Sequence, residues 1–310
     1  MKQVLRSLPR RKALKYLAIG SAGLSLPTIS FGMSEKIMKR TIASSGEKIG
    51  IVGLGTWQTF DVGSSEAGRT PLREVLRVLV ENGGNLVDSS PMYGSSEKVV
   101  GDLTHELDIE DPIFYATKVW TSGEGRGKSQ MESSMKKMGA NPMDLMQIHN
   151  LQDWRTHIKT LYDWKERGIV KHIGITHYVD SAHDQLERII KSEKLDFVQM
   201  NYSIGSRNAE RSLLPAALDN GVAVLTNVPY GGGSLFRKVK GKELPEWSKE
   251  FGCQSWGQFF LKYLLSNPAV TCVIPGTSKP HHMKDNMAAG LGRLPSDLQR
   301  KKMVDFMNTL

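Results

Sequence analysis

Four titratable side chains mark the first half of the sequence, because each ends or closely follows a short apolar run. They are Asp88, Tyr93, Lys118 and His149, in that order along the chain. A carboxyl, a phenol, an ammonium and an imidazole are groups that proteins use to give and take protons during a reaction. A single polar residue at the end of an apolar run is ordinary, because the chain meets water there. Four in succession predict a shared site.

The elements that must position these groups form one repeated pattern, in which short apolar runs alternate with longer segments of helical period. The runs are Ile49–Leu54, Asn85–Asp88, Ile113–Lys118, Leu145–His149, His172–Thr176, Phe197–Asn201, Ala223–Asn227 and Thr271–Pro275. The helical segments include Pro71–Asn82, Gln130–Met138, Trp154–Arg167, Ser181–Lys191, Arg207–Asn220 and Ser255–Leu265. Eight strands alternating with helices predict an α/β fold, a single-domain TIM (β/α)8 barrel, with catalytic groups at the carboxyl ends of the strands.

Two further features of the chain fit this pattern. Gly stands at the end of several helical segments, as at Gly139 and Gly168, where a helix cap is expected. The stretch Gly231–Pro245 is expected to be a long loop after the seventh strand. Loops of that length in a compact domain are usually functional.

The charge of the chain is concentrated at its beginning. The 310 residues have a net charge of +9, but residues 1–32 contain six basic and no acidic residues, which leaves +3 for residues 33–310. No dense run of Lys and Arg interleaved with aromatic residues follows Arg40. Nucleic-acid binding is therefore not expected.

Cysteine and histidine are placed unfavourably for a disulfide framework or a metal site. The two cysteines, Cys253 and Cys272, are expected to be buried apolar residues. His281 and His282 are adjacent and have no partners at metal-ligand spacing, so no structural or catalytic zinc is expected.

Residues 1–32 have the pattern of an export signal. A basic start that includes Arg10 and Arg11 precedes the short apolar stretch Tyr16–Leu26, and small residues stand three and one positions before Met33. The apolar stretch is too short and too rich in Gly and Ser for a comfortable membrane span.

The paired arginines followed by Ala13-Leu14-Lys15 resemble a twin-arginine signal. We therefore expect a signal peptide at residues 1–32 and a mature domain at residues 33–310. The Tat translocase would be a partner during export, and the periplasm would be the destination. The alternatives are a basic helix on a membrane surface, an uncleaved signal that anchors the protein, and a cytoplasmic protein.

Several motifs along the rest of the chain resemble those of one enzyme family. They are Gly53-Leu-Gly-Thr-Trp57, Val87-Asp-Ser-Ser-Pro-Met-Tyr-Gly94, Ser96-Glu-Lys-Val-Val-Gly101, Ala116-Thr-Lys118, Met143-Asp-Leu-Met-Gln-Ile-His149, Gly168-Ile-Val-Lys-His-Ile-Gly-Ile-Thr176, Gln199-Met-Asn-Tyr-Ser203 and Ile274-Pro-Gly-Thr-Ser-Lys-Pro280. As a set they resemble the aldo-keto reductases, from about residue 38 to the end. The resemblance implies an oxidoreductase that reduces aldehydes or ketones to alcohols with hydride from NADPH.

The resemblance also implies a role for each of the four titratable residues. Tyr93 would be the general acid, Lys118 would lower the pKa of Tyr93, Asp88 would be the counter-ion of Lys118, and His149 would orient the carbonyl oxygen. The chemistry agrees, because a free phenol titrates near about 10 and a neighbouring ammonium stabilises the phenolate. No side chain supplies hydride, so a nicotinamide cofactor must.

The nicotinamide end of the cofactor site is implied in the same way. Gln199 matches the glutamine that holds the nicotinamide amide, and Thr176 and His177 stand where a Ser-Asn pair with the same role is common. Asn227 stands where a tyrosine often stacks on the nicotinamide ring. That stacking is expected to be lost or supplied elsewhere.

The phosphates of the cofactor are expected at two other segments. Gly231 and Gly232, with the glycine after them, can bring backbone N–H groups close to the pyrophosphate, the alternative being a merely flexible loop. Thr277, Ser278 and Lys279 lead into a helix and match the site of the adenosine phosphate.

The choice between NADP and NAD depends on that second segment. Lys279 could pair with a 2′-phosphate, whereas His282 stands where an arginine is common and is mostly neutral at pH 7. NADP is favoured, and NAD remains an alternative. Asn286 matches the residue that contacts the adenine.

The substrate pocket is marked by two tryptophans, Trp57 and Trp120, which stand where the family often has aromatic walls. Each could equally be a packed tryptophan of the core. After a final helix, Ser296–Asn308, no long tail is expected to cover the pocket. We expect a monomer that acts on small or varied carbonyl compounds.

Two other functions compete with this interpretation. The segment Gly50-Ile-Val-Gly-Leu-Gly55 hints at a Rossmann-type dehydrogenase, but its spacing differs from G-x-G-x-x-G. A non-catalytic NADP-binding regulatory protein on the same barrel would fit the substituted positions His177 and Asn227. Carbonyl-dependent turnover separates a regulator from a reductase.

Overall fold

The computed structural model describes residues 36–310, which belong to one compact unit. The expected signal peptide, residues 1–32, and the expected cleavage before Met33 lie outside the described residues.

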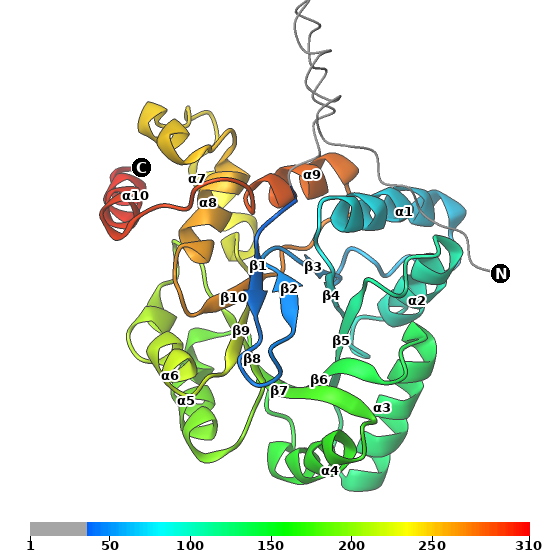
Figure 1. Cartoon of the computed structure of the whole chain (residues 1–310). Helices are drawn as coiled ribbons and strands as arrows, with labels where there is room; N and C mark the ends of the chain where they lie inside the picture. Colours follow the sequence, from blue (N-terminus) through cyan, green and yellow to red (C-terminus); the bar gives the residue numbers. More distant parts are fainter. Residues whose placement is uncertain (1–35) are drawn as a thin grey trace, which may run out of the picture. The chain divides into compact units, whose positions relative to one another are not determined.

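Eight parallel strands form the barrel (Figure 1). They are β3 (Leu54–Gly55), β4 (Leu86–Asp88), β5 (Phe114–Val119), β6 (Met143–His149), β7 (Val170–Thr176), β8 (Phe197–Asn201), β9 (Ala223–Asn227) and β10 (Val270–Val273). Each strand is hydrogen-bonded to the next one along the chain. Parallel bridges between Val52 and Val273 and between Gly55 and Gly276 bring the first and last strands together. The predicted (β/α)8 barrel is confirmed.

The strands have an inward and an outward face because successive side chains alternate. In β6, Leu145 belongs to the cluster inside the barrel, whereas Met146 and Ile148 pack outward against the helices. The inward faces of the strands begin with apolar residues that fill the barrel, such as Leu86, Phe114, Leu145, Phe197, Ala223 and Leu225. The same faces continue toward the carboxyl ends, where the predicted polar residues lie.

The first apolar run, Ile49–Leu54, is divided between two elements. Its beginning lies in β2 (Lys48–Gly50), which pairs antiparallel with β1 (Lys39–Thr41), and only its end enters barrel strand β3. This hairpin, which the sequence did not predict, lies across the centre of the view in Figure 1. Ile42 and Ile49 insert into the interior cluster, so the hairpin closes the amino-terminal end of the barrel. The Rossmann alternative is wrong. Gly50 ends β2 of the hairpin and Gly55 ends barrel strand β3, so these glycines do not form a turn between a strand and a helix.

Helices surround the barrel in Figure 1. They are α1 (Glu66–Glu81), α2 (Ser96–Glu106), α3 (Glu124–Met138), α4 (Trp154–Glu166), α5 (His183–Ser192), α6 (Leu213–Asp219), α7 (Ser234–Lys238), α8 (Trp256–Leu265), α9 (Pro280–Ala288) and α10 (Asp297–Thr309). Helix α1 begins five residues before the predicted Pro71, because the Ser65 hydroxyl accepts the N–H of Gly68 and caps the helix there. Gly139 ends α3 with φ 67°, as predicted.

The segment after β9 is more ordered than the long loop predicted for it. A 3₁₀ turn, Gly231–Gly233, leads into α7, and a second 3₁₀ segment covers Glu246–Phe251. Both cysteines are buried and free, as predicted.

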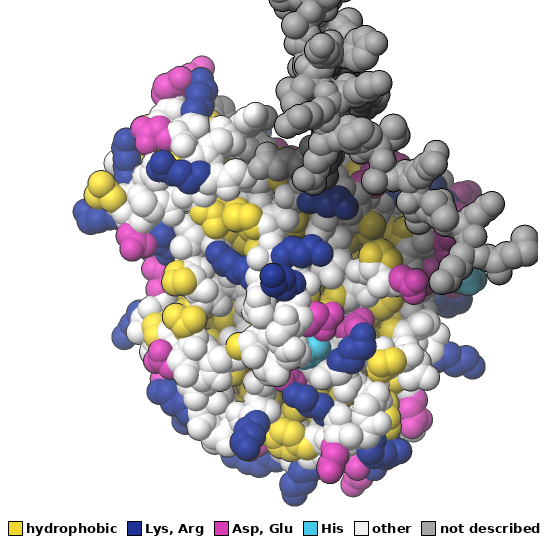
Figure 2. Space-filling model, viewed as in Figure 1, with side chains coloured by type: hydrophobic (Ala, Val, Ile, Leu, Met, Phe, Trp, Pro, Cys, Tyr) yellow, Lys and Arg dark blue, Asp and Glu magenta, His cyan; other side chains and the backbone are white. Residues whose placement is uncertain are grey.

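The surface of the described residues is mixed in charge. On the face shown in Figure 2, the Lys and Arg side chains alternate with Asp and Glu. Among residues 36–310, no helix is both long enough and apolar enough to cross a bilayer.

Candidate active site

The structure brings the four predicted titratable residues together at the carboxyl end of the barrel. Asp88 ends β4, Lys118 lies near the end of β5, and His149 ends β6. Tyr93 lies on the loop between β4 and α2. The ammonium nitrogen of Lys118 is 5.0 Å from the centre of the Tyr93 ring, and the rings of Tyr93 and His149 meet edge to face at 5.8 Å.

Asp88 and Lys118 form an ion pair beneath Tyr93. Lys118 Nζ donates to Asp88 Oδ2 at 2.6 Å and to the main-chain oxygen of Ser89 at 2.6 Å. Neither side chain reaches water to any extent, since Lys118 is 0% and Asp88 2% exposed. Burial lowers the pKa of Lys118, but its interactions with the charged Asp88 and with Tyr93 outweigh burial and raise that pKa above 10.5, so the amine is an ammonium.

The second oxygen of Asp88 is held by two glutamines. Gln147 Nε2 donates to Asp88 Oδ1 at 3.0 Å, and Gln199 Nε2 donates to the same oxygen at 2.9 Å. Gln147 lies two residues before His149, so it shares the inward face of β6. Sequence reasoning missed Gln147, although this spacing from His149 was a usable signal.

Tyr93 differs from expectation in the direction of its pKa. Burial raises the pKa of the phenol above 10, and the lowering by Lys118 does not overcome burial and the charge of Asp88. Lys118 lowers the pKa of Tyr93, as predicted, but the net pKa lies above that of a free phenol and not closer to neutral as expected. Tyr93 is protonated at neutral pH, which is the form that a proton donor needs.

His149 is a neutral imidazole, and one of its ring nitrogens is hydrogen-bonded within the protein. Burial, with a further contribution from the charge of Lys118, lowers the pKa of His149 to about 2. Its Nδ1 lies 2.9 Å from the hydroxyl of Ser90, another residue that the sequence analysis did not assign.

Strands β7, β8 and β9 place Thr176, Gln199 and Asn227 next to the four titratable residues. Asn227 Nδ2 donates to Gln199 Oε1 at 3.2 Å and to the main-chain oxygen of His177 at 3.3 Å, while Asn227 Oδ1 is buried without a partner among the described residues. Gln199 is therefore hydrogen-bonded both to Asp88 and to Asn227. The His177 ring stacks on Tyr178, with centroids 5.5 Å apart.

The glycine triplet after β9 has a backbone that side-chain-bearing residues rarely adopt. Gly231, Gly232 and Gly233 have φ values of 58°, 61° and 84°. The N–H groups of Gly231 and Gly233 donate to the carbonyls of Val228 and Tyr230, so these two amides are already used within the turn. The triplet forms a hydrogen-bonded 3₁₀ turn, and its contact with the pyrophosphate stays a prediction.

The predicted adenosine-phosphate segment leads into α9. Thr277 is buried, and its hydroxyl accepts the main-chain N–H of Lys279 at 3.1 Å. Asn286 is also buried, and its Oδ1 accepts the Tyr230 hydroxyl at 2.5 Å. Ser278 is partly buried at the same turn.

Lys279 and His282 are the two residues on which the choice between NADP and NAD was predicted to depend. Lys279 is exposed, whereas burial and the neighbouring His281 and Lys279 lower the pKa of His282. His282 is therefore neutral at pH 7, and of the two residues only Lys279 carries a positive charge.

The rim of the site is apolar and exposed. Trp57 is 57%, Trp120 42% and Met92 41% exposed. The packed-core alternative is wrong for both tryptophans. The Trp120 ring lies 6.5 Å from that of His149.

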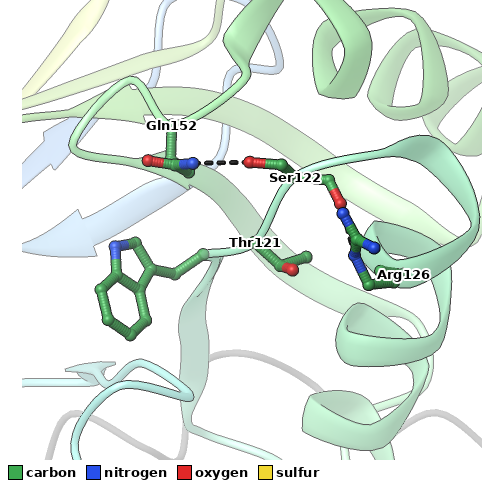
Figure 3. A pocket seen from close by; sticks show the side chains of 5 residues that line it. Thr121, Ser122, Arg126 and Gln152 are labelled. Atoms are coloured by element: carbon green, nitrogen blue, oxygen red, sulfur yellow. Dashed lines mark hydrogen bonds between the residues drawn. The ribbon is translucent and has the colours of Figure 1, made fainter.

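Beyond Trp120 the surface is hollowed. A cavity of about 410 Å³ is lined by Trp120, Thr121, Ser122, Arg126 and Gln152 (Figure 3). The amide of Gln152 donates to the Ser122 hydroxyl at 2.6 Å across its wall. Within residues 36–310, no cluster of three His, Cys, Asp or Glu side chains could hold a metal.

Comparison with known proteins agrees with this geometry. The family model described as "Aldo/keto reductase family" matches residues 51–299. The chain belongs to the aldo/keto reductase family.

Two relatives show how far this sequence has diverged from other proteins of the family. Aldo-keto reductase YhdN of Bacillus subtilis is 28% identical over 68% of this chain and 66% of its own length. L-glyceraldehyde 3-phosphate reductase of Escherichia coli is 23% identical over 81% of this chain and 86% of its own length.

Solved structures share the fold at low sequence identity. The holo form of aldo-keto reductase AKR11C1 from Bacillus halodurans has a TM-score of 0.72 at 20% identity, covering 87% of this chain and 96% of that one. An aldo/keto reductase of Klebsiella pneumoniae, solved with NADP and acetate, has a TM-score of 0.72 at 20% identity, covering 88% and 95%.

Proposed function

We propose that this aldo/keto reductase reduces aldehydes or ketones to alcohols with hydride from NADPH, and that Tyr93 gives the proton to the carbonyl oxygen. The observation that carries the proposal is the buried ion pair of Asp88 and Lys118 beneath a protonated Tyr93, with neutral His149 at its edge. A buried ion pair costs desolvation free energy, so it requires a reason beyond stability. Stabilising a phenolate that forms during the reaction is such a reason.

The residues at the ends of β7 to β10 fit a dinucleotide. The buried and unpaired Asn227 Oδ1 can accept from a carboxamide N–H₂, which suits the nicotinamide end. Lys279 and the beginning of α9 can hold a phosphate, because a helix amino terminus offers free N–H groups and a positive dipole. The relative from Klebsiella pneumoniae, whose structure holds NADP, supports NADP over NAD.

NADPH supplies the hydride when it is bound. The side chains then have four tasks. His149 donates a hydrogen bond to the carbonyl oxygen as negative charge develops there. Tyr93 transfers its proton to that oxygen, and the ammonium of Lys118 stabilises the phenolate left behind. Asp88, Gln147 and Gln199 keep the ammonium in place.

The exposed Trp57, Met92 and Trp120 support an apolar or aromatic carbonyl compound as substrate. They present apolar surface around the position where the carbonyl must lie, and no described segment covers it. An open rim of this kind supports several small aldehydes rather than one.

Replacement of Tyr93 by Phe tests the function. The variant should lose at least about 100-fold in kcat for reduction of simple aldehydes by NADPH, because general acid catalysis contributes about 10²–10⁴-fold. Its affinity for NADPH, followed by tryptophan fluorescence, should stay within twofold or so of the wild type. A wild-type protein that binds NADPH without oxidising it in the presence of any carbonyl would instead be the cofactor-binding regulator.

We also propose that the protein is exported in the folded state through the twin-arginine route to the periplasm. The paired arginines, the short apolar stretch diluted by Gly and Ser and the absence of acidic residues in residues 1–32 support the proposal. A folded barrel would cross the membrane with its cofactor bound, because the residues at the ends of β7 to β10 that would hold the dinucleotide come together only in the folded barrel.

A further inference from the structure

We propose that Ser90 is a positioning residue that decides which ring nitrogen of His149 carries the proton, so that Nε2–H is the group offered to the carbonyl oxygen. The proposal rests on the reductase function proposed above and deepens it. A neutral imidazole has one N–H donor and one acceptor nitrogen, and the partner of one nitrogen selects the state of the other.

The contacts of Ser90 determine the direction of the hydrogen bond. Ser90 lies two residues beyond β4 and is 0% exposed. Its Oγ lies 2.9 Å from His149 Nδ1, and the main-chain N–H of Met92 donates to the same Oγ at 3.2 Å. Since the oxygen already accepts from Met92, its own hydrogen is free to point at Nδ1. All three groups are satisfied when Nδ1 is the acceptor.

The opposite tautomer leaves a buried donor without a partner. With the proton on Nδ1, Ser90 Oγ would accept twice, and its hydrogen would face no other polar group within hydrogen-bond distance in residues 36–310. A buried and unpaired donor is destabilising. A second proton on His149 would make both ring nitrogens donors. Burial lowers the pKa of the ring and keeps it neutral, so one of the two tautomers must form.

The remaining nitrogen, Nε2, is then a donor toward the pocket. It has no hydrogen-bond partner in the described part of the chain and is not among the enclosed polar atoms. The rings of Tyr93 and Trp120 flank His149 at 5.8 and 6.5 Å. With the other tautomer, Nε2 would present a lone pair to the lone pairs of the carbonyl oxygen, which removes the stabilisation of the developing charge.

Kinetics of Ser90→Ala, with Ser96→Ala as its matched control, give the first test. Ser96 is equally buried, but its hydroxyl has no partner, so its removal deletes the same group without touching His149. Ser90→Ala should lower kcat/KM about tenfold, the effect of one buried hydrogen bond, while Ser90→Thr restores most of it and Ser96→Ala stays at the wild-type value. NADPH affinity should be unchanged in all three.

The ¹⁵N chemical shifts of the His149 ring, assigned by comparison with His149→Gln, give a second test. A merely structural role of Ser90 would leave these shifts unchanged. The wild type should show a protonated Nε2 and an unprotonated Nδ1, and Ser90→Ala a mixture of tautomers. A protonated Nδ1 in the wild type overturns the proposal even if no Ser90 variant folds, and so does wild-type kcat/KM in Ser90→Ala. A wild type without turnover refutes the reductase function instead, and the nitrogen shifts then still decide the role of Ser90.

Discussion

Replacing Asp88 by Asn should remove several kcal/mol of stability, because the substitution leaves the ammonium of Lys118 buried without its counter-ion. Asn has nearly the same shape, so no cavity forms. Its oxygen can still accept from Gln147 and Gln199, but its N–H₂ group would then face Lys118 Nζ, where Asp88 Oδ2 now accepts at 2.6 Å. The main-chain oxygen of Ser89 would be the one acceptor left to that nitrogen within the described structure.

The magnitude follows from the burial of both partners. Removing one member of a buried ion pair costs about 3–5 kcal/mol, because the other charge stays desolvated. We therefore expect Asp88→Asn and Lys118→Met each to lower the free energy of unfolding by that amount. The double variant should lose less than either single one, since it leaves no unpaired charge.

Urea unfolding at pH 7, followed by circular dichroism, measures all four proteins. The control is Glu124→Gln, which breaks the exposed i,i+4 pair with Lys128 and should leave the midpoint unchanged. A loss of less than about 1 kcal/mol for Asp88→Asn, or simple additivity in the double variant, would refute the view that Asp88 compensates a buried ammonium.

Three further outcomes are expected. His149 binds a proton below about pH 6.5 in the unfolded chain, but only near its pKa of about 2 in the folded protein. The free energy of unfolding should therefore fall as the pH drops below about 6.5, by about 2 kcal/mol between pH 6.5 and 5. His149→Gln should make the free energy of unfolding depend less on pH in this range. Gly101→Ala should destabilise the protein by about 1–3 kcal/mol, because its Cβ would lie 2.2 Å from a main-chain oxygen of α3, whereas Gly125→Ala, with open space around it, should be neutral or slightly stabilising in the same urea assay. In cell fractions, the full-length chain should appear in the periplasm beginning near Met33, and joint replacement of Arg10 and Arg11 by Lys should leave the precursor in the cytoplasm; equal periplasmic amounts of both would exclude this route.

The sequence predicted the barrel well because the barrel is a local pattern repeated eight times. Strands β8 and β9 have the bounds predicted from Phe197–Asn201 and Ala223–Asn227. The first run was misjudged, because apolar character alone does not distinguish a barrel strand from a hairpin that inserts Ile42 and Ile49 into the barrel end. Hydrophobic periodicity did not predict helix α2. Its first residues, Ser96 to Gly101, were recognised only as one of the family motifs.

The sequence by itself determined which groups could meet. A carboxyl, an ammonium and an imidazole at the ends of neighbouring strands must share one rim, because parallel strands in a barrel end on the same side. Alternation of side chains along β6 also placed Gln147 on the face of His149, although that signal was not used.

Tertiary structure alone decided how those groups act on one another. Gln199 reaches Asp88 across 111 residues of sequence, and Ser90 reaches His149 across 59. The direction of the Tyr93 pKa shift depended on burial, which outweighs Lys118 and which no spacing in the sequence measures. Hydrogen bonds and desolvation vary over ångström distances between segments far apart in the chain, so they follow from packing and not from residue order.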